Sequence, residues 1–193
     1  LIIPVGKWII QNAFSMCTEC RKYYPEFRVS INLSYVQILK SPLMMELKQI
    51  IDHSGISCSG IIVELTESGY LEGTPAVRSV WNDMKQLRIQ IALDDFGTGY
   101  SNLMNISNLE PDIVKLDRGF TLKALSRSYE YQLMQYVIEM VHKLNQYVCV
   151  EGVETKEDLE KIKALGPDLI QGYYYSKPCS RDEFLKKFFD YSE

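Results

Sequence analysis

Six short apolar runs, rich in β-branched residues, alternate along this chain with stretches of helical periodicity. The runs occupy residues 29–32, 61–64, 91–94, 113–115, 148–151 and 169–171. Apolar residues recur at helical spacing over residues 4–24, 35–53, 75–88, 128–146, 156–166 and 181–189. Strands that are joined through crossover helices must run parallel. The alternation therefore predicts an α/β fold, either a barrel or a doubly wound sheet.

Length constrains the barrel alternative, because eight strand-helix units typically need about 250 residues and this chain has 193. About one unit is missing, and Leu1 leads directly into a helical stretch with no strand ahead of it. We therefore expect a barrel that is incomplete at its N-terminus. Apolar residues make up 46% of the chain, and no linker divides it, so we expect a single globular domain over residues 1–193.

Charge and cysteine content exclude several classes of function. The net charge is −4 with acids and bases interspersed, which leaves no basic stripe for a long nucleic acid. No run has the apolar length of a membrane span and no signal peptide is visible, so we expect a cytoplasmic domain. Five cysteines, an odd number, indicate a reducing compartment. Acids within the helical stretches are expected to be solvated surface charges: Glu19, Glu46 and Glu157.

Two short motifs do not support a function of their own. Cys17 and Cys20 form a C-x-x-C, but no second C-x-x-C follows and the histidines are His53 and His142 alone. We interpret the pair as packed thiols on a helix rather than a zinc site. Residues 96–100, Phe-Gly-Thr-Gly-Tyr, lack the third glycine of a dinucleotide-binding fingerprint, and their glycines are better explained by a sharp turn.

Polar side chains close all six apolar runs. They are Asn32, Glu64, Asp94 with Asp95, Lys115 with Asp117, Glu151 and Gln171. In a parallel barrel the carboxyl ends of the strands form the active site, so function is expected at that end. Adjacent carboxylates such as Asp94 and Asp95 repel each other unless a cation neutralises them. The alternative is that the pair caps a following loop or helix.

Neighbouring polar residues support a metal site. Glu64 closes a strand and Glu67 can reach back from the loop, so that one binds while the other braces. Asn32 supplies a neutral oxygen that hard cations accept, although it is equally suited to a strand-end turn. Oxygen donors without thiolate or imidazole favour Mg²⁺ or Mn²⁺. Two such ions are suited to in-line displacement at a phosphate.

Lys115 and Asp117 point to the same face of their strand, and we place Asp117 on the substrate side. A buried lysine needs an anionic partner, which a phosphate or a metal-bound hydroxide would provide. The alternative partner is Asp117 itself, in an internal ion pair. Glu151 and Glu154 repeat the strand-end carboxylate pattern, and Thr155 is placed to cap the next helix.

In order along the chain, six blocks resemble the EAL-type phosphodiesterases that hydrolyse cyclic di-GMP. The blocks are residues 29–34, 64–67, 93–101, 113–117, 151–155 and 171–173, and the resemblance runs from residue 1 to about residue 178. It implies a modified TIM-like (β/α) barrel. It also implies a reaction that opens one 3′–5′ phosphodiester bond to give linear pGpG.

The resemblance implies a two-metal site that takes Mg²⁺ or Mn²⁺. One ion would be held by Asn32, Glu64 and Asp94. Asp94 would bridge to a second ion, which Asp95 and Glu151 would serve. The family's name-giving Glu-Ala-Leu strand is absent from this chain, and with it a metal-binding glutamate and an arginine that helps to hold substrate phosphate, so this chain alone is expected to be weakly active or inactive.

Catalytic and bracing roles follow from the same resemblance. Lys115 would contact the nucleophilic water and the phosphate, Glu151 would also act as general base, and Gln171 would lie near the water and the phosphate. Glu67 and Glu154 resemble braces for the loop over residues 96–101. In the family the region that continues to residue 110 lies near a homodimer interface, so a homodimer is expected.

The leading hypothesis is a cyclic di-GMP phosphodiesterase domain from a longer bacterial signalling protein, with an upstream sensory or GGDEF-type domain or a membrane anchor. The main alternative is a non-catalytic relative that binds cyclic di-GMP or a protein partner. Degenerate relatives usually lose acids from the Asp-Asp or Glu-x-x-Glu blocks, and this chain has both, which favours the enzyme. An unrelated metal-dependent barrel enzyme, such as an aldolase or enolase, would make six ordered blocks a coincidence.

Overall fold

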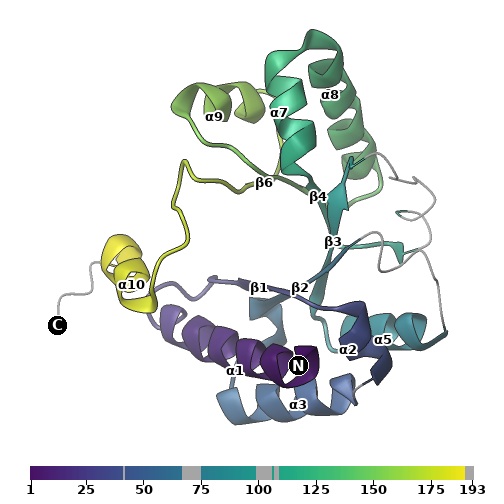
Figure 1. Ribbon diagram of the computed structural model, residues 1–193, viewed down its shortest axis with the longest axis vertical. Coiled ribbons are helices and arrows are strands. Elements are labelled where there is room, and N and C mark those ends of the chain that lie inside the picture. The colour runs from purple at the N-terminus through teal and green to yellow at the C-terminus, as the bar shows by residue number, and fades with distance from the viewer. Residues whose placement is uncertain (41, 67–74, 99–105, 107–108, 190–193) are drawn as a thin grey trace. The chain divides into compact units, whose positions relative to one another are not determined.

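Helices and parallel strands alternate along the computed structural model, which describes residues 1–40, 42–66, 75–98, 106 and 109–189 (Figure 1). Two compact units make up the chain. The first comprises Leu1–Ile91 together with Cys179–Glu193, and the second comprises Ala92–Pro178. Each unit thus combines strands with the helices that cover them.

The first unit holds one pair of strands and most of the helices of the N-terminal half. Its elements are α1 (Ile2–Cys20), β1 (Val29–Asn32), α2 (Tyr35–Lys40), α3 (Leu43–Ser54), the 3₁₀ turn η1 (Cys58–Gly60), β2 (Ile61–Thr66), α5 (Pro75–Gln86) and the C-terminal α10 (Arg181–Phe189). β1 and β2 are parallel, with Val29 opposite Ile61 and Asn32 opposite Glu64. α1 packs against α2, α3 and β1, which buries Phe14 completely.

The helix predicted over residues 35–53 is two helices, α2 and α3. Pro42 is the N-cap of α3, and a proline has no backbone N–H with which to continue a preceding helix. α3 ends at Gly55, whose φ of 64° is left-handed. Glycine adopts this conformation without steric cost and commonly ends helices in this way.

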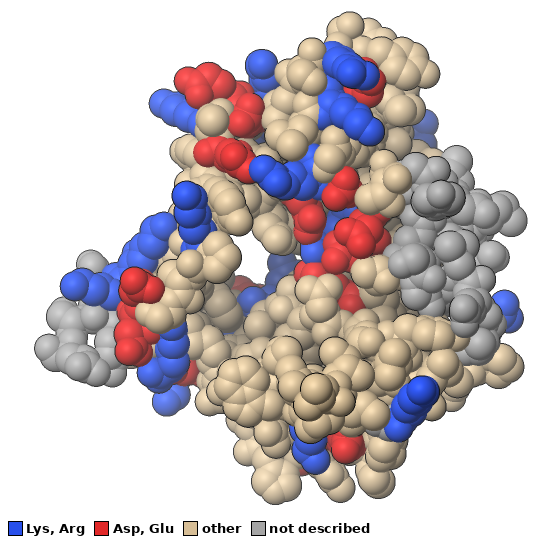
Figure 2. Space-filling model, viewed as in Figure 1, with Lys and Arg blue, Asp and Glu red and all other residues tan. Residues whose placement is uncertain are grey.

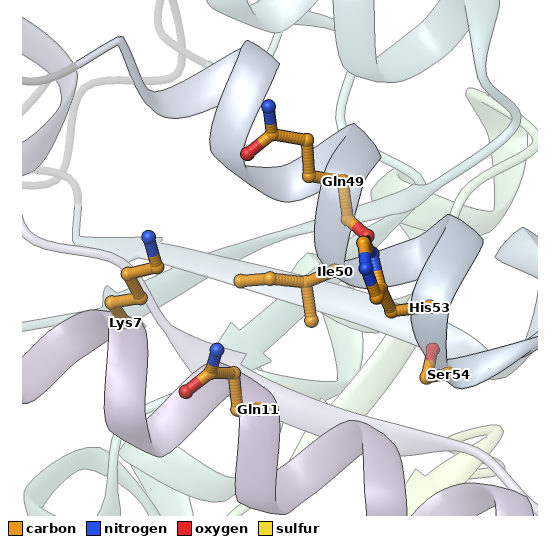
Figure 3. Close-up of a pocket in the computed structure, with 6 residues that line it drawn as sticks. All are labelled: Lys7, Gln11, Gln49, Ile50, His53 and Ser54. Carbon is orange, nitrogen blue, oxygen red and sulfur yellow. Dashed lines mark hydrogen bonds between the residues drawn. The ribbon is translucent and has the colours of Figure 1, made fainter.

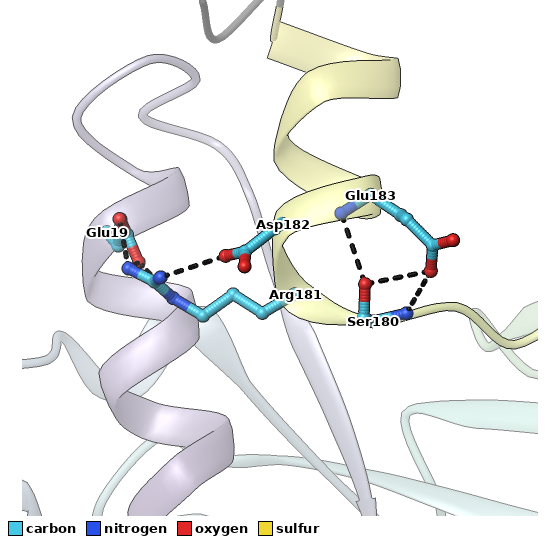
Figure 4. A network of polar contacts seen from close by, with 5 residues as sticks. All are labelled: Glu19, Ser180, Arg181, Asp182 and Glu183. Carbon is cyan, nitrogen blue, oxygen red and sulfur yellow. Dashed lines mark hydrogen bonds and ion pairs between the residues drawn. The ribbon is translucent and has the colours of Figure 1, made fainter. Parts of the chain in front are cut away.

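Helix α10 is linked to α1 by an ion pair between Arg181 and Glu19 that includes three hydrogen bonds (Figure 4). The Nε of Arg181 lies 2.9 Å from Glu19 Oε2, and Nη2 lies 2.6 Å from Oε1. Phe184 of α10 also packs edge-on against Phe27, with 6.0 Å between ring centroids. The expectation that Glu19 is a solvated surface charge is therefore wrong, because its side chain is paired with Arg181 and only 22% exposed. The partner lies 162 residues away in the sequence, where a local pattern cannot show it.

Of the other two acids expected on the surface, Glu157 is exposed. Glu46 is half-buried and lies 3.7 Å from the ammonium of Lys7. A surface pair with 3.7 Å between its charged atoms contributes little to stability. Because Glu157 is exposed, it remains a suitable control position for charge removal.

The second unit is built on four parallel strands whose spatial order is their order in the chain. Its elements are β3 (Gln90–Phe96, from Ala92 onward), β4 (Ile113–Leu116), α7 (Arg118–Ser126), α8 (Ser128–Lys143), β5 (Tyr147–Val150), α9 (Lys156–Lys163) and β6 (Leu169–Ile170). All four residues of β4 are buried, as near-continuous apolar strands predict. Thr155 caps α9, since its Oγ1 accepts from the Asp158 N–H at 3.1 Å, which confirms the predicted cap.

Figure 2 shows Lys and Arg side chains as well as Asp and Glu side chains on the described face, in agreement with the low net charge of −4. Among the helices that the structure describes, none is long and apolar enough to cross a membrane.

Candidate functional site

Lys115 lies between two carboxylates in the second unit. Its Nζ is 3.0 Å from Asp94 Oδ1 and 2.6 Å from Glu151 Oε1, and the lysine side chain is 6% exposed. Asp94 and Lys115 lie on the paired strands β3 and β4, and Glu151 directly follows β5, which pairs with β4. A buried ammonium needs such partners. If all three groups are ionised, two negative charges and one positive charge leave the cluster with a net charge of −1.

An irregularity in β3 accompanies the acidic pair. Leu93 pairs with Val114 and Phe96 pairs with Leu116, so β3 has one residue more than β4 over this interval. Asp95 lies within it and has a φ of 61°, a left-handed conformation that costs a non-glycine residue about 1–3 kcal/mol. Bulges are frequent beside active sites, where they redirect side chains. The bulge interrupts the strict alternation of side chains at the two consecutive aspartates of β3.

The carboxylate of Asp117 is the N-cap of α7. Its Oδ1 accepts a hydrogen bond from the Gly119 N–H at 2.7 Å, and its backbone oxygen accepts from the Thr121 N–H at 3.0 Å. The alternatives considered from sequence were a substrate-side carboxylate and an ion pair with Lys115. The structure gives this carboxylate a structural task that sequence reasoning missed.

Glu151 and Gln171 follow directly after β5 and β6. The Glu151 N–H donates to the Leu116 oxygen at 3.1 Å, and the Gln171 N–H donates to the Val150 oxygen at 2.9 Å. These bonds continue the parallel ladder by one residue beyond each strand. The backbone of both residues is therefore fixed, although the Gln171 side chain itself is exposed.

Of the two predicted loop braces, Glu154 lies within the described residues and Glu67 lies outside them. Glu154 Oε1 is 2.7 Å from Nη2 of Arg118, the first residue of α7. The loop that both glutamates are expected to brace is described only as far as residue 98. Sequence reasoning did not single out Arg118, which directly follows the Lys115-x-Asp117 block.

Two further predicted ligands lie side by side in the first unit. Asn32 is opposite Glu64 in the pairing of β1 with β2, and the backbone oxygen of Glu64 accepts a hydrogen bond from the Leu33 N–H at 2.9 Å. Glu64 is 6% exposed, and its Oε1 accepts a short hydrogen bond from Ser30 Oγ. Ser30 is two residues before Asn32, so strand alternation places both on one face. That spacing could have identified Ser30 as the hydrogen-bond donor.

The carboxylate of Asp94 shows whether the oxygen donors of the second unit suit a divalent cation. Its Oδ1 is buried and, among the described residues, accepts no hydrogen bond of good geometry, although Lys115 lies nearby. No group of three or more His, Cys, Asp or Glu side chains within the described ranges is arranged to hold a metal ion. A buried carboxylate oxygen without a hydrogen bond fits a hard cation. The donor chemistry of the second unit is therefore compatible with such an ion.

A groove between α1 and α3 in the first unit is lined differently. Lys7 and Gln11 of α1 face the α3 residues Gln49, Ile50, His53 and Ser54 (Figure 3). His53 Nδ1 lies 2.7 Å from the Gln49 backbone oxygen. No carboxylate is among these six lining residues, so the groove lacks the donors that hard cations need.

Comparison with known proteins places the chain in a family. The sequence model described as the EAL domain matches residues 1–178. The cyclic di-GMP phosphodiesterase PdeR of Escherichia coli is 32% identical over 178 residues, which are 92% of this chain and 27% of PdeR. The cyclic di-GMP phosphodiesterase PdeF of Escherichia coli is 30% identical over 174 residues, which are 90% of this chain and 23% of PdeF.

A solved structure agrees with the sequence comparison. The EAL enzyme Bd1971, in a form bound to cAMP and cyclic di-GMP, superposes with a TM-score of 0.91 at 29% identity. The match covers 96% of this chain and 52% of that one. The predicted α/β fold of the TIM-like EAL type is thereby confirmed. The chain spans about a quarter of the length of the two curated relatives.

Proposed function

Because this chain belongs to the EAL domain family, we propose that it hydrolyses cyclic di-GMP to linear pGpG in a metal-dependent reaction. The observation that carries the proposal is the buried Lys115 ammonium between the carboxylates of Asp94 and Glu151. Two relatives of at least 30% identity are named cyclic di-GMP phosphodiesterases. A buried positive charge beside two acids is suited to binding a phosphodiester and directing a water at it.

In this proposal a water oxygen bonds to phosphorus, the bond from phosphorus to the 3′ oxygen breaks, and that oxygen takes up a proton from solvent. Lys115 donates hydrogen bonds to the phosphate and orients the water. Glu151 accepts the proton of the water, while Gln171 holds the water from the end of β6. Asp117 keeps the start of α7 in place beside Lys115.

The residues proposed to hold the metal are all oxygen donors at strand ends: Asn32, Glu64, Asp94, Asp95 and Glu151. Bound Mg²⁺ or Mn²⁺ supplies positive charge that lowers the pKa of a water and neutralises the phosphate. The buried Oδ1 of Asp94, which has no hydrogen-bond partner among the described residues and lies 3.0 Å from the Lys115 ammonium, supports this assignment.

The chain covers 23% of the length of PdeF and 27% of the length of PdeR. We propose that the whole protein includes a sensory or GGDEF-type domain upstream, that it acts in the cytoplasm, and that it forms a homodimer. Equilibrium sedimentation that shows only monomers at high concentration, in a fully active sample, would contradict the proposed homodimer.

The decisive experiment is hydrolysis of cyclic di-GMP in Mn²⁺ by this chain and, in parallel, by the full-length product of its gene. Chromatography of the products should show pGpG, and EDTA should abolish its formation. If calorimetry shows binding of cyclic di-GMP but neither form turns it over, the protein would be a cyclic di-GMP receptor rather than an enzyme. Neither binding nor turnover would leave a protein-interaction role.

A further inference from the structure

Arg118 connects two strand-end segments of the second unit. It is the first residue of α7, directly after the Lys115-x-Asp117 block. Its Nη2 lies 2.7 Å from Glu154 Oε1, three residues beyond Glu151. One ion pair therefore links the segment after β4 to the segment after β5.

The stem of Arg118 also packs across Gly152. A Cβ added to Gly152 would lie 2.3 Å from Arg118 Cγ and 3.1 Å from Arg118 Cα, and Gly152 has a φ of +79°. Backbone conformation and close contact thus both require a glycine here. The residue directly after Glu151 is in this way held against the start of α7.

The same segment is also held by the loop after β6. The Val153 N–H donates a hydrogen bond to the backbone oxygen of Gln171 at 3.2 Å, and the backbone oxygen of Val153 accepts one from the Tyr174 N–H at 3.1 Å. A Cβ at Gly172 would lie 1.9 Å from the Val153 oxygen. The segment over residues 151–154 therefore contacts both the start of α7 and the loop after β6.

We propose that Arg118 and Glu154 are positioning residues, which form a clasp that holds Glu151 in its 2.6 Å contact with Lys115. This inference rests on the proposed function, in which Glu151 takes up a proton. Arg118 and Glu154 are 59% and 38% exposed, so their ion pair contributes little to global stability. The clasp instead limits the motion of the segment that carries Glu151, and a small displacement of a catalytic group is costly to the rate.

The test uses Arg118→Met, Glu154→Gln and the double variant in the full-length protein. Arg118→Met keeps much of the stem and removes the charge, whereas Arg118→Lys restores a charge. A matched control exists in Arg127→Met, because Arg127 forms an exposed ion pair with Glu130 at 3.1 Å in the same unit. The readouts are kcat and KM for cyclic di-GMP, thermal unfolding, and hydrogen exchange at the amides of Val153 and Tyr174.

We expect kcat to fall about 10- to 100-fold in each single variant, with KM and the melting temperature little changed. The double variant should be no slower than the singles, since both remove one interaction, and Arg118→Lys should recover part of the rate. Exchange at Val153 and Tyr174 should accelerate in the clasp variants and stay at the wild-type rate in Arg127→Met.

Two results would overturn the clasp. One is wild-type exchange at both amides in Arg118→Met, and a loss of kcat with that exchange would mean that Arg118 contacts the substrate directly. The other is faster exchange with wild-type kcat, which would mean that the ion pair does not position Glu151. A wild-type protein without turnover would contradict the proposed function alone, because the exchange measurement would still decide whether the clasp exists.

Discussion

Glu151, the residue after β5, has its Oε1 2.6 Å from the ammonium nitrogen of Lys115 on β4, and the two side chains are 17% and 6% exposed. Removal of one member of a buried ion pair leaves the other charge without compensation. Here the lysine compensates two carboxylates, since Asp94 lies 3.0 Å away on its other side. Loss of the lysine charge is therefore expected to destabilise the fold as well as to remove the proposed chemistry.

Replacement of Lys115 by Met should abolish hydrolysis and destabilise the protein by about 3–5 kcal/mol in the absence of metal. Urea unfolding monitored by circular dichroism measures the loss. Added Mn²⁺ should restore part of the stability, because a divalent cation can replace the missing positive charge. Lys123→Met, at an exposed position of α7, is the control. Equal metal-free stability of Lys115→Met and wild type would contradict the buried-charge argument.

Asp94→Asn should reduce turnover by more than about 100-fold and weaken Mn²⁺ binding, because an amide oxygen carries no charge for the cation. Calorimetry gives the binding constant directly, without reliance on activity. Glu157→Gln, on the exposed side of α9, should leave both quantities unchanged. Wild-type turnover in Asp94→Asn would remove the two-metal mechanism.

The strand ends were predictable from sequence because a parallel strand of the core is short, apolar and closed by a polar residue. That local pattern found Asp94, Lys115 and Glu151, which the structure brings together. The bulge at Asp95 was not predictable from that local pattern, because a bulge is visible only in the register between two paired strands.

Long-range partners were not predictable in the same way. Glu19 resembled any acid on a helix, and only the folded chain brings Arg181 to it. The weak apolar pattern of α7 concealed the helix that Asp117 caps, since Phe120, Thr121 and Ala124 are its buried residues.

Arg181→Ala should lower the free energy of unfolding by up to about 1 kcal/mol, the upper range for an exposed ion pair, because the two-point contact with Glu19 is lost. Glu19→Gln should have a similar effect, and the double variant should be little worse than either single one. Urea midpoints measure the three values. Fully additive losses would mean that the two side chains do not interact in solution.

Cys17 and Cys20 should react slowly with an alkylating agent in the native protein. Both are free and fully buried on α1, in agreement with the packed thiols predicted from sequence. Burial raises the pKa of the Cys17 thiol, and burial with the nearby Cys17 and Glu19 raises the pKa of Cys20 to about 11. A raised pKa leaves less thiolate, which is the reactive form. Exposed Cys179 should be the first cysteine to be alkylated, which mass spectrometry of the labelled protein would show. Rapid alkylation of Cys20 at neutral pH would contradict its burial.

Asp117 offers a test that separates helix capping from a direct role at the substrate. Asparagine is also a good N-cap, so Asp117→Asn should preserve stability, whereas Asp117→Ala should lose roughly 1 kcal/mol because the Gly119 N–H loses its acceptor. If the carboxylate serves only as a cap, kcat of Asp117→Asn should equal that of wild type. If its charge also acts on the substrate, as its position after Lys115 predicts, the same variant should be stable but slow. Thermal unfolding and kcat measured on both variants distinguish the two roles, since capping depends on a side-chain oxygen and the substrate-side role depends on a negative charge.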